Sequence, residues 1–156
     1  DAVQLVADND YVVVRDKGRQ VVGILTASDF SLQFRALAEP FLLIGEIEQG
    51  MRLLLDGKFT EEQLAQLIGE CGGSSRVQGI DDLTLGDYVA LLQRPAAWDR
   101  LDLRIDRKIF TEKLDDVRRI RNNVMHFKPN GLEAEQVEDL RAFARFMRRL
   151  RDVIAG

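Results

Sequence analysis

Two long stretches of helical periodicity near the C-terminal end most constrain how this chain can fold. Apolar residues recur every three or four positions from Ile109 to Val124, and again from Val137 to Ile154. Side chains with that spacing share one face of an α-helix, and such a face is normally buried against another element. Lys128-Pro129-Asn130-Gly131 separates the two stretches, because proline and glycine disfavour helix continuation. The sequence therefore predicts helices over 106–124 and 133–155 in a mainly α fold.

Three further segments complete a predicted helical bundle of about five helices over residues 39–156. Glu39-Pro40 is expected to break the chain ahead of a helix over Phe41–Leu55, because proline suits a helix start. Thr60-Glu61-Glu62-Gln63 has the pattern of a capping box, and Thr84-Leu85-Gly86-Asp87 also fits a helix start. Arg94-Pro95 is expected to end that last helix, and a short turn then carries Trp98, whose large ring is more typical of a core than of a stacking platform.

Residues 1–38 predict a small N-terminal α/β piece, made of a β-hairpin plus a helix. The end of a helix reaches Asn9, and the β-branched run Tyr11–Val14 and the run Gln20–Leu25 predict two strands. Asp16-Lys17-Gly18-Arg19 predicts the turn between them, with a glycine able to take positive φ. A helix running to about Ala38 then starts at Thr26-Ala27-Ser28-Asp29, with Thr26 or Ser28 as its N-cap.

Charge is distributed unevenly along the chain. The net charge is −4, with 22 Lys/Arg and 26 Asp/Glu, which argues against a general nucleic-acid binder. Residues 1–56 and 57–103 each carry a net −4, whereas residues 104–156 carry thirteen basic and nine acidic residues, a net +4. A polyanionic partner is therefore expected at the last third. A solvated face is the simpler interpretation of the arginines of 133–155, because the basic end of that helix complements its dipole.

The cysteine count and the hydropathy limit the environment of the chain. The single cysteine, Cys71, cannot form an internal disulfide, so a cytoplasmic location is expected. With one histidine in the sequence, Cys71 also cannot build a Cys/His zinc site, and no metal is predicted. No apolar run approaches the roughly 20 residues that span a bilayer, so no membrane partner is expected. The first residues, Asp1-Ala2-Val3-Gln4, suggest a part of a longer protein.

The N-terminal piece resembles part of a known nucleotide-binding motif. Its helix–strand–strand–helix order and Gly23-Ile24-Leu25-Thr26-Ala27-Ser28-Asp29 resemble the C-terminal half of a cystathionine-β-synthase (CBS) motif. In that family the threonine and the aspartate face a nucleotide, which the resemblance transfers to Thr26 and Asp29 with an adenine nucleotide as regulator. Helix N-terminal amides and a hydroxyl suit a phosphate. The alternative is that Thr26 and Asp29 only cap the helix.

Residues from Thr84 to the end resemble the HEPN superfamily of small helical bundles. The matching features are Trp98, the helix start Asp106-Arg107-Lys108-Ile109-Phe110, and Arg121-Asn122-x-x-x-His126 at the end of the penultimate helix. The resemblance implies a homodimer in which both motifs face one another across the interface. It also implies either a metal-independent endoribonuclease or a noncatalytic binder.

The residue types of this motif suit RNA cleavage even without the resemblance to a family. Cleavage of RNA by its own 2′-hydroxyl needs a base, an acid and positive charge on the phosphate. His126, with an ordinary pKa of about 6.5, suits the acid–base role, and Arg121 suits the phosphate. Asn122 and His126 share a helix face, whereas Arg121 lies about 140° round from His126. Arg121 and His126 therefore meet only if the helix end unwinds or a second subunit contributes. Alternatively, His126 and the two asparagines only cap the helix end.

The sequence thus predicts a regulated ribonuclease that needs no cofactor for catalysis. Arg121, Asn122 and His126 would form its catalytic site, RNA would be the substrate, and a homodimer would be the active form. The rival prediction is a noncatalytic, nucleotide-responsive dimerisation or interaction module. A purely structural helical scaffold is a third hypothesis.

Overall fold

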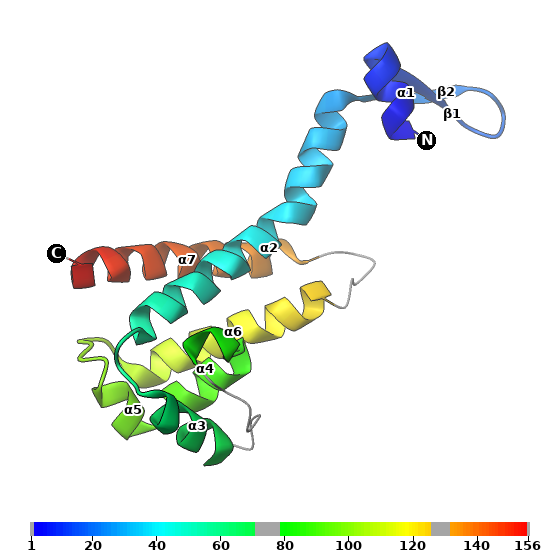
Figure 1. The fold of residues 1–156 in the computed structure, drawn as a ribbon. Coiled ribbons are helices and arrows are strands. Elements are labelled where there is room, and N and C mark those ends of the chain that lie inside the picture. Colours follow the sequence, from blue (N-terminus) through cyan, green and yellow to red (C-terminus); the bar gives the residue numbers. More distant parts are fainter. Residues whose placement is uncertain (1, 71–78, 126–131, 156) are drawn as a thin grey trace. The chain divides into compact units, whose positions relative to one another are not determined.

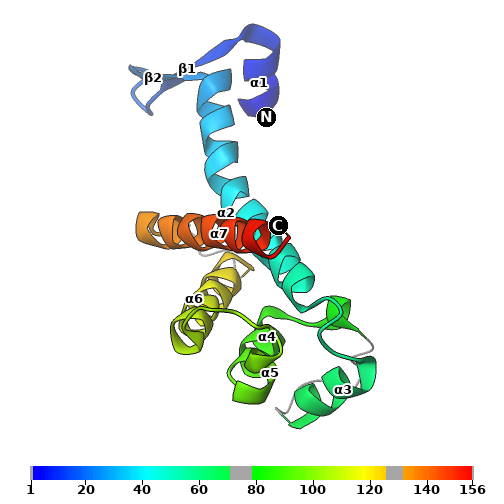
Figure 2. The same ribbon diagram turned by 90° about the vertical axis from the view of Figure 1, so that its left-hand side faces the viewer.

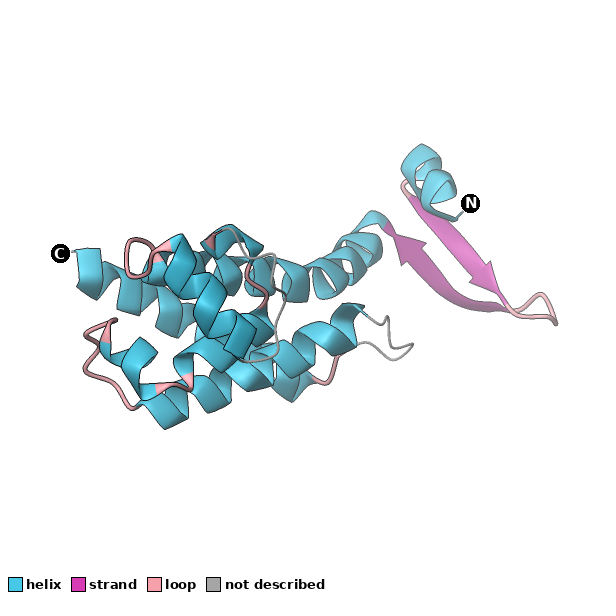
Figure 3. Ribbon diagram, turned by 60° about the horizontal axis from the view of Figure 1, so that its bottom comes forward, coloured by secondary structure: helices cyan, strands magenta, loops and turns pink. Residues whose placement is uncertain are grey.

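The computed structural model describes residues 2–70, 79–125 and 132–155 of the chain, and within them it is mainly helical. One two-stranded antiparallel sheet near the N-terminus is the exception (Figure 3). The chain divides into two compact units, Asp1–Glu39 and Pro40–Gly156. In the part of the chain that the structure describes, no helix has both the length and the apolar character to cross a bilayer.

The first unit is a helix, a β-hairpin and the beginning of a second helix. Helix α1 spans Ala2–Asn9, strand β1 spans Tyr11–Arg15, strand β2 spans Val21–Thr26, and α2 begins at Ala27 (Figure 1). The strands pair with Tyr11 opposite Thr26 and Val14 opposite Gly23, with an irregular register between Val14 and Arg15. The predicted hairpin is confirmed. Helix α1 packs against β1, and Val6 of α1 is 2% exposed.

The hairpin turn does not use its glycine at positive φ. The left-handed residue is Arg19, with φ of 64°, rather than Gly18. The Asp16 carbonyl accepts a hydrogen bond from Arg19 N, and the Asp16 carboxylate accepts one from Gln20 N, each at 3.0 Å. This is a tight turn followed by a left-handed residue, a common hairpin connection. Glycine at position 18 instead avoids a close contact, because a Cβ there would lie 3.2 Å from the Asp16 carboxylate oxygen.

Helix α2 corrects the predicted break at Glu39-Pro40. It continues from Ala27 to Leu55 with Pro40 inside it. A proline within a helix removes one hydrogen bond and costs about 3 kcal/mol. Burial of the following turns offsets that cost. The buried residues of α2 are Pro40, Leu43, Ile44, Ile47, Met51, Leu54 and Leu55.

The second unit is a helical bundle, which confirms the predicted fold class at that level. After α2 come α3 (Glu61–Glu70), the 3-10 turn η1 (Ile80–Asp82), α4 (Leu85–Leu92), α5 (Pro95–Asp99), α6 (Arg107–Met125) and α7 (Ala134–Ala155). Helix α4 packs against α6, and α6 packs against α7 (Figure 2). The sequence predicts only a turn where the short helix α5 forms. Pro95 both ends α4 and occupies the first turn of α5, where its missing N–H costs nothing.

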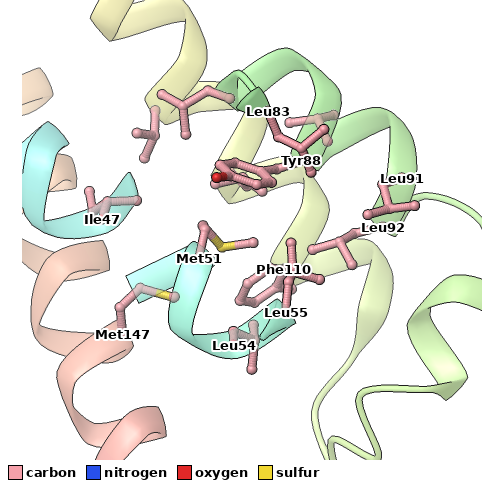
Figure 4. Packing of buried hydrophobic residues seen from close by; sticks show 14 of the residues in the cluster. Ile47, Met51, Leu54, Leu55, Leu83, Tyr88, Leu91, Leu92, Phe110 and Met147 are labelled. Carbon is pink, nitrogen blue, oxygen red and sulfur yellow. The ribbon is translucent and has the colours of Figure 1, made fainter. Parts of the chain in front are cut away.

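The core of the second unit gathers around Tyr88, which is fully buried (Figure 4). Ile47, Met51 and Leu55 from α2 and Leu91 and Leu92 from α4 belong to the same buried cluster. The Tyr88 hydroxyl donates a hydrogen bond to the Ile80 carbonyl at 3.3 Å, so the buried polar atom has a partner. Burial raises the pKa of Tyr88 to about 12, and the hydroxyl therefore stays protonated.

An aromatic cluster joins α5, α6 and α7. The ring of Phe110 lies 5.3 Å from that of Trp98, 5.6 Å from Phe143 and 6.1 Å from Phe146, all in tilted geometry. Tilted aromatic pairs at such distances add about 0.5–1.5 kcal/mol beyond their buried area. Trp98 is 7% exposed, so the prediction that it belongs to the core is confirmed.

Helices α2 and α7 approach closely at Gly50. A Cβ on Gly50 would lie 3.2 Å from Met147 Cε and 3.5 Å from Met147 Cβ. Nearby, Arg148 of α7 forms a bidentate ion pair with Glu46 of α2, in which Nη2 and Oε2 are 2.7 Å apart. That hydrogen bond is the main reason why the pKa of Glu46 is lowered. The sequence did not reveal this contact, which joins residues 102 positions apart.

Replacing Gly50 by leucine is expected to destabilise the bundle. The new side chain must displace Met147, and overpacking of this kind costs about 1–3 kcal/mol. Gly45→Leu is the matched control, because Gly45 lies on the same helix and a Cβ there would meet nothing within 4 Å. Both substitutions gain similar helix propensity, so urea unfolding of the two variants isolates the packing term. Equal unfolding midpoints would contradict the close approach of α2 and α7.

Candidate functional site

Helix α6 carries Arg121 and Asn122 in its final turns. Its buried residues are Phe110, Thr111, Leu114, Val117 and Ile120, and they fix the helix against the core. Arg121 and Asn122 follow directly after Ile120 and are half-buried. Since α6 stays helical to Met125, neighbouring side chains differ by about 100° around its axis. Arg121 and Asn122 are therefore held by a well-anchored helix, but they point in different directions.

The third predicted catalytic residue, His126, lies outside the described residues, as do Lys128-Pro129-Asn130-Gly131 and Cys71. The helix does not unwind before Met125. A rearrangement of the helix end that brings Arg121 toward His126 would therefore have to begin after Met125. The shared-dimer arrangement remains a prediction.

The arginines of α6 differ in their ion pairing. Arg118 Nε lies 2.6 Å from Asp115 Oδ1, and Arg119 Nη2 lies 2.8 Å from Asp115 Oδ2. Hydrogen bonding from Arg118, reinforced by the charges of Arg118 and Arg119, outweighs partial burial and lowers the pKa of Asp115. Arg121 has no hydrogen bond or ion pair from its side chain to any described residue. Its positive charge is thus not compensated within residues 2–70, 79–125 and 132–155, in contrast with that of its neighbours.

Thr26 and Asp29 form a reciprocal cap at the start of α2. Thr26 donates to Asp29 Oδ2 through its backbone N at 2.8 Å and through its hydroxyl at 2.7 Å. Asp29 N in turn donates to Thr26 Oγ1 at 3.4 Å. The Thr26 hydroxyl contributes most to lowering the pKa of Asp29, followed by the backbone N–H of Thr26. The structure therefore brings these two predicted residues together and places Thr26, rather than Ser28, as the N-cap.

Helix α4 begins with a nearly identical arrangement. Thr84 donates to Asp87 Oδ2 through its backbone N at 2.9 Å and its hydroxyl at 2.7 Å, and Asp87 N donates back to Thr84 Oγ1 at 3.3 Å. Thr84 lies outside the segment that resembles a CBS motif. Helix capping is therefore a sufficient physical reason for Thr26 and Asp29. Phosphate oxygens accept hydrogen bonds, so a nucleotide phosphate near Thr26 would need donors other than the Thr26 hydroxyl and backbone N–H, which donate to Asp29.

Two hollows beside α7 were not anticipated from the sequence. One of about 380 Å³ is lined by Phe110, Phe143 and Phe146, among others, and one of about 730 Å³ is lined by Leu101, Arg149 and Val153, among others. The alternating apolar residues Leu101, Leu103 and Ile105 were the available signal. The shape of the hollows, however, depends on how the segment after α5 packs beside α7. Sequence periodicity does not specify that packing.

Metal ligands are not clustered in the part of the chain that the structure describes. No group of three or more His, Cys, Asp and Glu side chains there is arranged to hold an ion. The carboxylates Asp115 and Glu46 are instead engaged by arginines. The polar side chains near the end of α6 include a cation, Arg121, and an amide, Asn122.

No protein-family model, curated protein or solved structure matches this chain. Among the described residues, two features bear on function: Arg121, which has no ion pair there, and the Thr26–Asp29 cap at the start of α2.

Proposed function

We propose that this chain is a HEPN-type, metal-independent endoribonuclease with its catalytic site at the end of α6. The observation that carries the proposal is the half-buried residue Arg121, whose guanidinium has no ion pair among the described residues, whereas carboxylates neutralise Arg118 and Arg119 on the same helix. An arginine without a carboxylate partner retains its fork of donors for a phosphate. Its position, one residue before Asn122 and five before His126, matches the Arg-Asn-x-x-x-His pattern.

The proposed reaction uses the substrate's own 2′-hydroxyl as nucleophile. A neutral imidazole of His126 accepts the 2′-hydroxyl proton as the oxygen attacks phosphorus, and the bond from phosphorus to the 5′-oxygen breaks. The leaving oxygen takes a proton from an imidazolium, which gives a 5′-hydroxyl and a 2′,3′-cyclic phosphate. Arg121 stabilises the extra negative charge on the phosphorane, and Asn122 orients the substrate or the imidazole.

A symmetric dimer would supply the second histidine. Each chain has one histidine, whereas the reaction needs a base and an acid. Two motifs that face one another would provide both groups, and they would also bring the partner's Arg121 toward His126. The N-terminal unit would then regulate the enzyme through an adenine nucleotide whose phosphate lies at the start of α2, near Thr26 and Asp29.

Cleavage of a labelled single-stranded RNA in the presence of EDTA tests the proposal. The wild-type protein is expected to release fragments that end in a 2′,3′-cyclic phosphate. Because an acid–base group contributes about 10²–10⁴-fold, His126→Ala is expected to lower the rate by at least about 100-fold. RNA with a 2′-deoxy residue at the cleavage position is the substrate control. Equal activity in both proteins, or no activity in either, would count against the enzyme.

A mixing experiment tests the shared site. Excess His126→Ala protein is added to a fixed amount of wild type, and subunits are allowed to exchange. If one site needs two histidines, activity falls as mixed dimers form. If each subunit acts alone, the activity per wild-type chain stays constant, and the shared-dimer mechanism is wrong even though the chain is a nuclease.

A noncatalytic interaction module is the second candidate function, and the surface of the first unit favours it. Val13 of β1 and Ile24 of β2 lie opposite one another in the sheet and are 41% and 61% exposed, and Tyr11, on the same face of β1, is 55% exposed. Soluble monomers rarely leave large apolar patches in water, so such a surface is typical of an interaction site. Calorimetry with adenine nucleotides, followed by a test for a change in oligomeric state, would support this module if RNA cleavage is absent.

A further inference from the structure

Two adjoining hollows of the helical bundle make up what we call the trough. They share the lining residues Ile105 and Phe146, so the smaller hollow of about 380 Å³ lies next to the larger one of about 730 Å³. Both volumes fall in the range of small-molecule sites, about 300–1,000 Å³. Apolar side chains at the margin stay in water, with Ile109 63% exposed and Val153 79% exposed. The trough therefore offers apolar surface that the fold itself does not cover.

The larger hollow is cationic. Lys58, Arg104 and Arg149 line it, and Asp102 is the carboxylate among its lining residues. Across the described ranges, none of the three cations has a side-chain ion pair or hydrogen bond. The other arginines of α7 behave differently, because each has a carboxylate partner. These are Arg141 and Arg145 with Glu138, Arg148 with Glu46, and Arg151 with Asp152.

The smaller hollow is an apolar compartment whose charged residues are mostly engaged. Asp106 accepts a hydrogen bond from Ile109 N at 2.9 Å and so caps α6, and Lys113 Nζ lies 3.9 Å from Asp116 Oδ2. Asp139 adds negative charge on the side of α7. An anionic group would be repelled there and attracted by Lys58, Arg104 and Arg149 in the larger hollow. The two hollows thus differ in character: the smaller is apolar with acidic residues, and the larger is cationic.

We infer that this trough binds a free long-chain carboxylate. The alkyl chain lies against Phe110, Phe143 and Phe146 in the smaller hollow, and the carboxylate lies among the three cations of the larger one. Burial of the methylenes against apolar side chains supplies affinity. The cations supply the preference for an anionic head, because they would repel a cationic one. The site is independent of the proposed ribonuclease activity.

Trp98 provides an intrinsic reporter for this binding. It is the only tryptophan in the sequence, and its ring lies 5.3 Å from that of Phe110, which lines the smaller hollow. Titration with monomeric dodecanoate is expected to change the Trp98 fluorescence in a saturable way, whereas dodecyltrimethylammonium of the same chain length binds at least about tenfold more weakly. Equal affinity for the two amphiphiles would overturn the inference.

Two variants separate the head site from the chain site. Arg104→Glu/Arg149→Glu is expected to weaken dodecanoate binding at least about tenfold, and Ala142→Phe, which fills the smaller hollow, to weaken it by a similar factor. Lys108→Glu is the matched control, since it changes charge on α6 outside the lining and should leave binding unchanged. If the Arg104→Glu/Arg149→Glu variant does not fold, the neutral variant Arg104→Gln/Arg149→Gln replaces it in the test of the head site. Unchanged binding in the folded head variants, or uptake of an acidic helical peptide without dodecanoate, would refute the site.

Discussion

Replacing Arg121 by alanine is expected to lower RNA cleavage by about 100–1,000-fold, with little effect on folding. A positioned donor that stabilises charge in the transition state contributes that much to kcat. Arg121 has no ion pair or hydrogen bond to the described residues, so its removal breaks none of these. The loss is therefore expected in the rate of the chemical step under saturating RNA, measured as single-turnover cleavage with EDTA present.

Arg119→Ala is the control that the chain itself provides. Arg119 lies two positions earlier on α6, carries the same charge and pairs with Asp115 and Asp116 at 2.8 and 3.6 Å. A general loss of positive charge would weaken RNA binding in both variants alike. A specific phosphate contact predicts a large loss for Arg121→Ala and a change of no more than a few-fold for Arg119→Ala. Equal losses in the two variants would exclude the specific role of Arg121.

Replacing Phe110 by alanine is expected to cost about 3–5 kcal/mol of stability. Phe110 is 3% exposed and stands among the rings of Trp98, Phe143 and Phe146, so the substitution opens a cavity where α5, α6 and α7 meet. Domains have only about 5–15 kcal/mol in total. The loss should appear as a lowered urea midpoint followed through Trp98 fluorescence. Ile109→Ala, at a neighbouring side chain that is 63% exposed, is expected to cost below about 1 kcal/mol.

Urea midpoints for Phe110→Ala and Ile109→Ala that agree within error would show that the aromatic cluster does not hold the helices together. A large loss in both would point instead to a wider disruption of α6, because alanine has the higher helix propensity and cannot itself cause the loss. The two variants differ mainly in burial, because each replaces a large side chain by alanine at one of two adjacent positions.

The helices of the second unit could be predicted largely because their signals are local. Periodicity and capping patterns anticipated α6 and α7 to within one or two residues, at Arg107–Met125 and Ala134–Ala155. The break predicted at Pro40 is wrong because the local cost of a proline does not include the burial of Ile44, Ile47 and Met51 beyond it. The burial that offsets this cost depends on packing between distant segments, which a local pattern does not contain.

The residue types of the candidate site could be proposed from the sequence, but the ion pairs around them could not. The sequence identified Arg121 and Asn122 through their spacing from His126. It did not reveal that Asp115 neutralises Arg118 and Arg119 and leaves Arg121 uncompensated among the described residues, because side chains three and four positions apart on a helix have several competing partners. The cationic trough was also missed, since Lys58, Arg104 and Arg149 are far apart in sequence.

The repeated Thr-x-x-Asp cap has a consequence for how short motifs are read. The same four-residue pattern, with the same three hydrogen bonds, begins both α2 and α4. Helix initiation alone selects threonine and aspartate at these positions, so the pattern recurs in one chain without any shared ligand. Its diagnostic value for nucleotide binding therefore comes from what surrounds it, here the strand residues Gly23-Ile24-Leu25 that lead into Thr26. In the search for distant relatives, that strand-to-helix junction carries more information than the two polar residues themselves.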